Sequence, residues 1–151
     1  MPNTPAQVGL GMNVYHAADA VEGGQLRAVE ALLQASGETL SVSDENAIDA
    51  ATAISGSGPA YVFYVAEHWM AAALKLGFSN EEAEQLVQQT LIGATALWKE
   101  QRVPAGTLRE QVTSKGGTTA AALEHFEKHQ IGTHFEGGVE RAYQRAKELG
   151  G

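Results

Sequence analysis

The chain has 151 residues, 44% of them hydrophobic and 19% charged, which suits a globular protein with a core and excludes a disordered one. Its net charge of −8 argues against a nucleic-acid partner, because no basic stripe could neutralise phosphates. Without cysteine it can form neither disulfides nor thiolate metal sites. The longest apolar stretch, residues 58–76, contains three polar or charged side chains and predicts a buried helix, so we expect no membrane partner. No signal peptide is recognisable, and we expect a cytoplasmic protein.

The first 43 residues differ in pattern from the rest. Short β-favouring runs at 13–16 and 39–42 flank a helix-like segment over about 24–36, which Gly37 ends. So small a β–α–β unit cannot bury both faces of its strands, and it resembles the edge of a sheet whose remainder is absent. We therefore expect a chain that begins in the middle of a fold.

Residues 44–151 carry the periodicity and the start and stop signals of successive helices. Pro59 suits the first turn of a helix that Gly77 ends. Ser79 and Glu82 form the pattern of a capping box for the next helix. The expected helices span about 45–52, 59–76, 81–98, 104–111, 118–129 and 135–149. The predicted fold class is mainly α, a helical bundle preceded by a small β–α–β unit.

The helix expected at 59–76 is apolar around most of its circumference, because Tyr61, Phe63, Tyr64 and Trp69 point in different directions. A helix that is apolar on all sides has to be covered on all sides. About seven short helices hardly achieve that within one subunit, so we expect a homodimer or a larger homo-oligomer. The alternative is a helix at the middle of a monomeric bundle.

Two runs of glycine and hydroxyl residues each lead into an expected helix: Ile-Ser-Gly-Ser-Gly-Pro-Ala-Tyr at 54–61 and Val-Thr-Ser-Lys-Gly-Gly-Thr-Thr at 112–119. Such a turn leaves backbone N–H groups unpaired at the positive end of a helix, where a carboxylate or phosphate can bind. An ordinary helix N-cap is the alternative for each. Neither run is a dinucleotide or phosphate-loop fingerprint. His125 and His129 lack a zinc pattern, so we expect a solvated helix face and no metal site.

Four blocks, in this order and spacing, resemble pyrroline-5-carboxylate reductase. They are Met-Pro-Asn-Thr-Pro at 1–5, the segment 48–61, Gln-Thr-Leu-Ile-Gly-Ala at 89–94, and the run 112–119. The resemblance implies a helical dimerisation and substrate-binding domain at 44–151, similar to the C-terminal domain of 6-phosphogluconate dehydrogenase. It also implies that residues 1–43 are the remnant of the end of a dinucleotide-binding Rossmann domain. NADPH or NADH would serve the complete enzyme, and this chain alone would bind neither.

The implied reaction is hydride transfer from the nicotinamide to the C=N carbon of 1-pyrroline-5-carboxylate, which gives L-proline in the final step of proline biosynthesis. The resemblance gives catalytic roles to Thr52, near the ring and the nicotinamide, and to Glu100, near the imine nitrogen. Asn3 and Thr4 would contact only the edge of the cofactor. The substrate-binding residues would be Ser57, Thr113, Ser114, Lys115, Gly116, Gly117 and Thr118.

Two alternatives remain from the sequence. One is a catalytically inactive helical oligomerisation module left by loss of the cofactor domain. The other is the helical domain of another two-domain dehydrogenase that acts on a different small acid. Lys115 also departs from the family, which often has proline there. Lysine adds a donor and a charge, so it is either a helper in carboxylate binding or a solvated surface residue.

Overall fold

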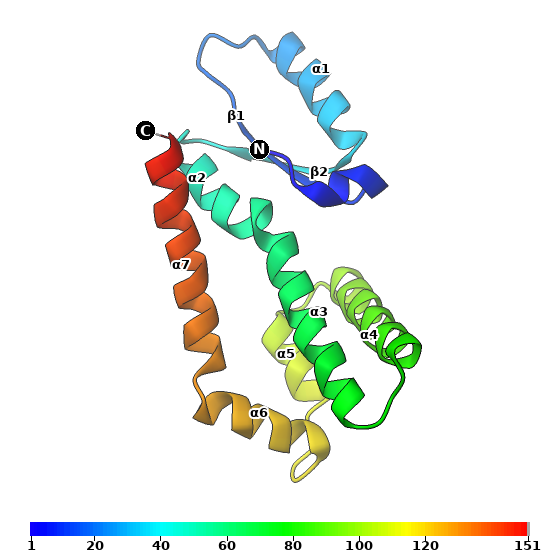
Figure 1. Ribbon diagram of the computed structural model, residues 1–151. Coiled ribbons are helices and arrows are strands. Elements are labelled where there is room, and N and C mark those ends of the chain that lie inside the picture. The colour runs from blue at the N-terminus through cyan, green and yellow to red at the C-terminus, as the bar shows by residue number, and fades with distance from the viewer. Residues whose placement is uncertain (151) are drawn as a thin grey trace. The chain divides into compact units, whose positions relative to one another are not determined.

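The computed structural model describes residues 1–150, which fold into two compact units (Figure 1). One unit contains Met1–Val62 and the chain from Phe135 onward, and the other contains Phe63–His134. Most of the chain is helical, with a two-stranded sheet near its start. The expected fold class is confirmed. The expected division between residues 43 and 44 stays a prediction.

The first unit is built on a parallel pair of strands joined by a helix. β1 (Gly11–His16) pairs with β2 (Gly37–Val42), and α1 (Gly23–Gln34) connects them and packs against β2. Gly37 stands opposite Gly11, and a Cβ on Gly37 would lie 2.0 Å from the Gly11 carbonyl oxygen. Only glycine allows the strands to approach so closely at the start of their pairing. The expected β–α–β unit is therefore present.

A small core ties β1 to the end of α1. Val14 is 1% exposed and Asn13 is 2% exposed. The Asn13 side-chain amide donates to the Leu33 carbonyl oxygen at 3.1 Å and to the Ser36 hydroxyl oxygen at 3.2 Å. A buried amide needs such partners, because an unpaired one would cost the desolvation of its polar group. Asn13 thus fixes the last turn of α1 against the sheet.

Residues 47–75 form one nearly continuous helical run, where the sequence suggested a helix, a turn and a second helix. Its parts are α2 (Ala47–Ala51), the π-helical segment η2 (Thr52–Gly56) and α3 (Gly58–Lys75). The prediction of a turn with unpaired amides before Pro59 is wrong at this point. The Ser57 N–H donates to the Thr52 carbonyl oxygen at 2.8 Å, five residues back, instead of facing a ligand.

The second unit consists of helices around a few small buried side chains. This unit contains α3 from Phe63 onward, α4 (Asn80–Gln101), α5 (Ala105–Gln111) and α6 (Thr118–Lys128). Ala73 on α3 is 8% exposed, and Ala83 and Val87 on α4 are 0% and 3% exposed. The connection between α3 and α4 is held to the end of α3 by the Phe78 N–H, which donates to the Ala73 carbonyl oxygen at 3.3 Å.

The start of α4 carries the expected capping box. The Ser79 hydroxyl oxygen accepts from the Glu82 N–H at 3.2 Å, and the Glu82 carboxylate accepts from the Ser79 N–H at 2.8 Å. The hydrogen bonds from Ser79 lower the pKa of the Glu82 carboxyl. The prediction from the Ser-x-x-Glu spacing is confirmed in both directions of the reciprocal pair.

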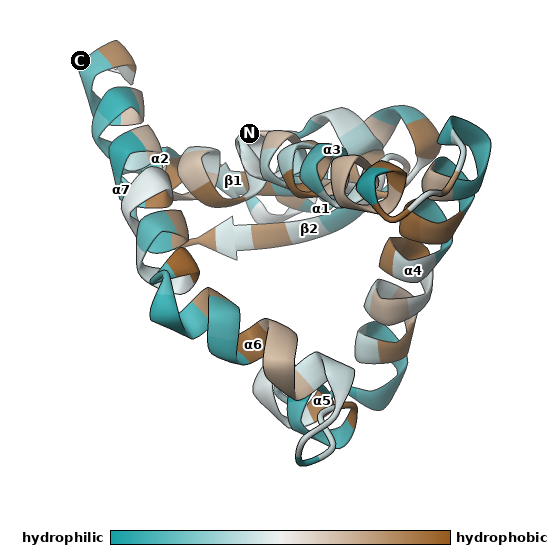
Figure 2. Ribbon diagram, turned by 60° about the horizontal axis from the view of Figure 1, so that its bottom comes forward, coloured by the Kyte–Doolittle hydropathy of each residue, from teal (hydrophilic) through white to brown (hydrophobic). Residues whose placement is uncertain are grey.

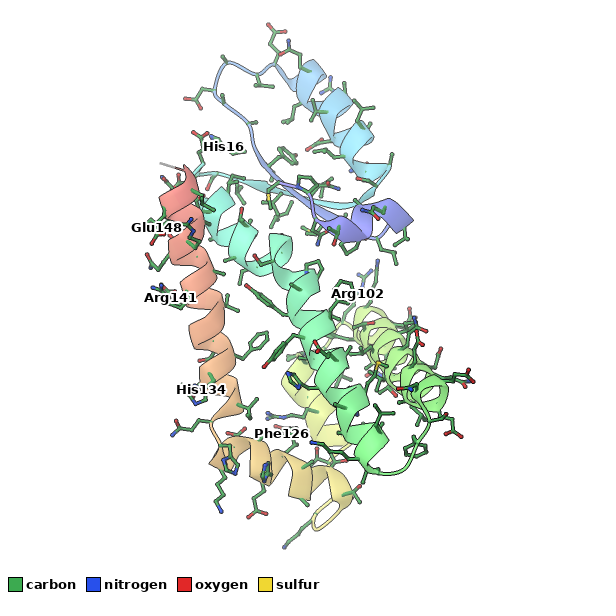
Figure 3. All side chains as sticks on the ribbon, in the orientation of Figure 1. His16, Arg102, Phe126, His134, Arg141 and Glu148 are labelled. Atoms are coloured by element: carbon green, nitrogen blue, oxygen red, sulfur yellow. The ribbon has the colours of Figure 1, made fainter. Side chains whose placement is uncertain are left out.

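The last helix, α7 (Ile131–Gly150), begins four residues earlier than the sequence suggested. Gln130, in the left-handed region at φ 53°, separates it from α6. Within the first unit, Phe135 of α7 packs edge-on against the Tyr61 ring, with 5.7 Å between ring centroids. His134, labelled in Figure 3, lies in the first turn of α7.

Most of the apolar surface of α3 is left uncovered by residues 1–150. Ala73 is its buried residue, and brown apolar residues follow both α3 and α4 in Figure 2. The large side chains of α3 that are at least 41% exposed are Val62, Phe63, Tyr64, Val65, Trp69 and Leu74. Such a continuous apolar surface marks an interaction face. This exposure agrees with the expectation that a second subunit is needed to bury the apolar side chains of α3.

Candidate functional site

The 113–119 turn starts where α5 ends. Its first residue, Thr113, donates hydrogen bonds to carbonyl groups in the last turn of α5. The Thr113 hydroxyl donates to the Arg109 carbonyl oxygen at 2.5 Å, and the Thr113 N–H donates to the Glu110 carbonyl oxygen at 3.0 Å. Both bonds occupy carbonyl groups that the last turn of a helix leaves without partners. The Thr113 hydroxyl proton is thereby committed to the backbone, so this residue anchors the turn.

Two glycines give the turn its path. The Gly117 N–H donates to the Ser114 carbonyl oxygen at 3.0 Å, and Gly116 has φ +72°, a conformation that favours glycine. A Cβ on Gly117 would lie 2.4 Å from the Ser114 hydroxyl oxygen and 3.2 Å from its carbonyl oxygen. Any side chain at residue 117 would therefore displace Ser114.

Gly117 is also the N-cap of α6, and it offers no side chain to the amides of the first turn. Its carbonyl oxygen accepts from the Ala121 N–H at 3.1 Å, so the helical ladder begins there. The preceding N–H groups of α6 lie at the positive end of the helix and are left for an external acceptor. Ser114 and Thr118 carry exposed hydroxyl groups on either side of the glycines. This arrangement can hold a compact anion.

Lys115 lies at the exposed tip of the same turn. Its ammonium group adds positive charge beside the helix N-terminus. The turn thus combines backbone amides, two hydroxyl groups and a cation within six consecutive residues.

The other group of expected site residues lies on η2, at Thr52, and at its C-cap, Ser57. The Thr52 hydroxyl donates to the Ile48 carbonyl oxygen at 2.8 Å, so its oxygen keeps lone pairs that can accept a hydrogen bond. The half-buried Ser57 hydroxyl has no hydrogen-bond partner among residues 1–150. Its proton and its oxygen are both available to a ligand.

Asn3 and Thr4 lie at the start of the chain, and Thr4 begins the short 3-10 helix η1 (Thr4–Val8). The Asn3 side chain has partners at both ends within the protein. Its amide nitrogen donates to the Ser55 carbonyl oxygen at 3.0 Å, and its amide oxygen accepts from the Met12 N–H at 2.9 Å. Asn3 therefore links η2 to β1, a contact that the sequence motif did not reveal.

Glu100 is the last residue but one of α4, which ends before its C-cap Arg102, with φ 53° (Figure 3). Ala96, Lys99, Glu100 and Arg102 line an open pocket of about 510 Å³. Thr52 and Ser57 belong to one compact unit, and Glu100 belongs to the other together with the 113–118 residues. The structure thus brings the expected substrate residues together in two local groups, with Glu100 on an element of its own.

Comparison with known proteins identifies the family. A family model described as pyrroline-5-carboxylate reductase dimerisation matches residues 45–149. The chain belongs to this family. The pyrroline-5-carboxylate reductase of Haemophilus influenzae is 40% identical over 150 residues, which are 99% of this chain and 55% of that protein. The pyrroline-5-carboxylate reductase of Pseudomonas aeruginosa is 40% identical over 149 residues, with the same two shares.

Solved reductases have the same fold as the chain. A pyrroline-5-carboxylate reductase from Coxiella burnetii matches with a TM-score of 0.94 and 39% identity, over 99% of this chain and 55% of that one. The Plasmodium falciparum pyrroline carboxylate reductase, solved with NADP bound, matches with a TM-score of 0.93 and 34% identity, over 100% of this chain and 62% of that one. The chain spans about 55% of the length of the curated reductases cited above.

No group of three or more His, Asp or Glu side chains within residues 1–150 could hold a metal ion. His125 and His129 stack with 4.4 Å between ring centroids on the exposed face of α6. None of the described helices is both long and apolar enough to cross a membrane.

Proposed function

We propose that this chain is the dimerisation and substrate-binding part of a reductase that converts 1-pyrroline-5-carboxylate to L-proline with NADPH or NADH. The observation that carries the proposal is the 113–119 turn, whose amides and hydroxyls suit the carboxylate of a small ring. The match of the family model to residues 45–149 supports a domain that starts near residue 44. Residues 1–43 would then be the end of the dinucleotide-binding domain.

The described residues do not fit a dinucleotide by themselves. The connection from β1 to α1 is Ala17-Ala18-Asp19-Ala20-Val21-Glu22, and it contains no glycine. The Gly-Gly pair that starts α1 does not make the Gly-x-Gly-x-x-Gly pattern that brings a backbone close to a pyrophosphate. The cofactor would therefore be held mainly by the part of the reductase that this chain does not span, with Asn3 and Thr4 at its edge. Bound there, it would supply the hydride.

The residues of this chain would bind and orient the substrate. The amides at the start of α6, with the hydroxyls of Ser114 and Thr118, would hold the carboxylate and fix one end of the ring. Lys115 would strengthen that hold by its charge. Orientation of this kind lowers the barrier of a two-substrate reaction without an acid–base pair in the protein.

The imine nitrogen needs acceptors once it is protonated. The Thr52 hydroxyl oxygen suits this role, because its own proton is donated to the Ile48 carbonyl oxygen. The Glu100 carboxylate is the second candidate, and Ser57 would contact the ring beside Thr52. Charge and dipoles fixed before the reaction stabilise a cationic imine at no cost in reorganisation.

The family and the exposed apolar surface of α3 support a homodimer or a larger homo-oligomer. The net charge of −8 supports the absence of a nucleic-acid partner, and a cytoplasmic location stays a prediction. An inactive oligomerisation module remains the alternative, because the chain spans only part of its relatives.

The test is a chimera in which this chain replaces the matched C-terminal part of the Haemophilus influenzae reductase. We expect the purified chimera to oxidise NADPH when 1-pyrroline-5-carboxylate is added. Gly117→Val should raise KM for the substrate by at least about tenfold, since its Cβ would meet the Ser114 hydroxyl and carbonyl oxygens beside the amides that would bind the carboxylate.

Gly24→Val is the matched control, because Gly24 has nothing within 4 Å of the position of an added Cβ. It should leave KM unchanged. An unaltered KM in Gly117→Val would mean that the turn is only the start of a helix, and the substrate site would have to be sought elsewhere. A folded chimera that oxidises no NADPH would favour the inactive module.

A further inference from the structure

In the π-helical segment η2, one carbonyl group loses its backbone hydrogen-bond donor, and the hydroxyl group of a tyrosine donates to it instead. In a regular α-helix the Ala53 carbonyl oxygen would accept from the Ser57 N–H. Here that N–H donates to Thr52 instead. The Tyr61 hydroxyl donates to the Ala53 carbonyl oxygen at 3.0 Å. Ala53 is 1% exposed, so without Tyr61 its carbonyl group would be buried without a partner.

A second carbonyl group of η2 lacks its usual donor for a different reason. The donor to Ser55 in an α-helix would be the N–H of residue 59, and proline has none. The Asn3 amide nitrogen replaces it at 3.0 Å. A Cβ on the next residue, Gly56, would lie 2.5 Å from the terminal methyl group of Met1, so the start of the chain lies directly against the segment.

We propose that Tyr61 and Asn3 are positioning residues, which hold η2 in its π-helical form and thereby fix the Thr52 and Ser57 hydroxyls for the substrate. The two side chains reach η2 from different elements, Tyr61 from α3 and Asn3 from the segment before η1. Each one binds a carbonyl group that the backbone leaves without a donor when η2 is in its π-helical form. This inference rests on the proposed function, because it presupposes that the Thr52 and Ser57 side chains contact the substrate.

Tyr61 is held in place by a second contact. Its ring packs edge-on against Phe135 at 5.7 Å, so the hydroxyl cannot swing away from Ala53 without losing that packing. Loss of the hydroxyl would let the Ser57 N–H return to Ala53, its partner in an α-helix. The Ser57 side chain would then rotate about the helix axis and no longer present its hydroxyl in the same direction.

The test uses the active chimera and the variant Tyr61→Phe, which removes one oxygen and keeps the ring against Phe135. We expect kcat to fall about five- to tenfold while KM changes less than about twofold, because the carboxylate is bound by the other turn. Tyr143→Phe is the matched control, because Tyr143 lies on α7 with its ring beside the Lys147 ammonium group, outside η2 and outside the apolar surface of α3, and it should keep the parental kcat. Asn3→Asp, which keeps the acceptor for Met12 and loses the donor, should reproduce the loss.

Combined variants separate positioning from stability. If Tyr61 acts through Ser57, then Tyr61→Phe should lower kcat little further in a Ser57→Ala background. A lower melting temperature with parental kcat in Tyr61→Phe, while Ser57→Ala is impaired, would overturn the positioning role and leave the proposed function intact. Parental kinetics in both Thr52→Ala and Ser57→Ala would remove η2 from the site, and the positioning role with it.

Discussion

Gly117 shows how one residue can be required twice. The absence of a side chain leaves room for the Ser114 hydroxyl, which a Cβ would meet at 2.4 Å. The same absence leaves the amides of the first turn of α6 without a capping side chain. Serine or threonine at this position would stabilise the helix better but would occupy those donors itself. The position thus exchanges helix stability for amides that remain available to the proposed carboxylate ligand.

Thr118 tests the contribution of a hydroxyl group at that site. It lies just inside α6, after the N-cap, so its loss should not weaken a cap. We expect Thr118→Ala in the chimera to raise KM for 1-pyrroline-5-carboxylate about fivefold, which corresponds to about 1 kcal/mol for one hydrogen bond. Thr133→Ala, at an exposed position of α7, is the control. Equal KM values in both variants would exclude the Thr118 hydroxyl from the site.

The sequence contained enough information for the second turn and too little for η2. Gly116 predicts an unusual backbone conformation from local chemistry alone, and the structure has it, with φ +72° at this residue. The π-helical form of η2 depends on Asn3 and Tyr61, whose contacts form only in the fold. One signal was present: proline at 59 removes the donor for Ser55 and so predicts that another side chain must reach it.

Helix ends that depend on neighbouring residues were predicted correctly, and one that does not was missed. The capping box of α4 and the stop at Gly77, which has φ +99°, were predicted because each is set by residues next to it in sequence. The start of α7 at Ile131 was missed, because Gly132 within it resembles a loop residue.

The capping box makes the stability of α4 depend on pH. The pKa of Glu82 is lowered from its ordinary value of 4.5 because its carboxylate accepts from the Ser79 N–H. Its contribution is complete above the pKa of the unfolded chain and is lost as the pH falls through the lower pKa of the folded state. Glu82→Gln should therefore be less stable than the parent at neutral pH, and the difference should vanish in acid.

Urea unfolding at a series of pH values measures this difference. Glu84→Gln, two residues further along α4, changes the charge of the same helix outside the capping box and serves as the control. A gap between parent and Glu82→Gln that persists unchanged below the lowered pKa would contradict the assignment of the effect to the carboxylate.

At the scale of the whole molecule, the apolar surface of α3 requires a partner. Trp69 is 44% exposed and lies on this surface. In a homo-oligomer, Trp69→Asp would place an unpaired charge in the interface, at a cost of several kcal/mol, roughly. We expect light scattering at micromolar concentration to give a multiple of 15.9 kDa for the parent and a monomeric or unfolded chain for the variant.

Val8→Asp provides the control for that experiment. Val8 is 74% exposed but lies on η1, away from α3 in the sequence, so a charge there should not change the mass in solution. A parent that scatters as a single 15.9 kDa species would contradict the oligomer and leave the exposure of α3 unexplained.

The five residues of η2 can also be regarded as an α-helix into which one residue has been inserted. A π-helical segment is geometrically an α-helix with one residue too many, accommodated by a local widening of the backbone. Deleting one residue from η2 would let α2 and α3 join as an ordinary helix, and would turn the residues beyond the deletion by about 100° around the helix axis. Such a deletion would restore regular α-helical hydrogen bonding, but it would change the direction of every α3 side chain that follows it. We therefore expect the length of this segment to tolerate less change than its composition does.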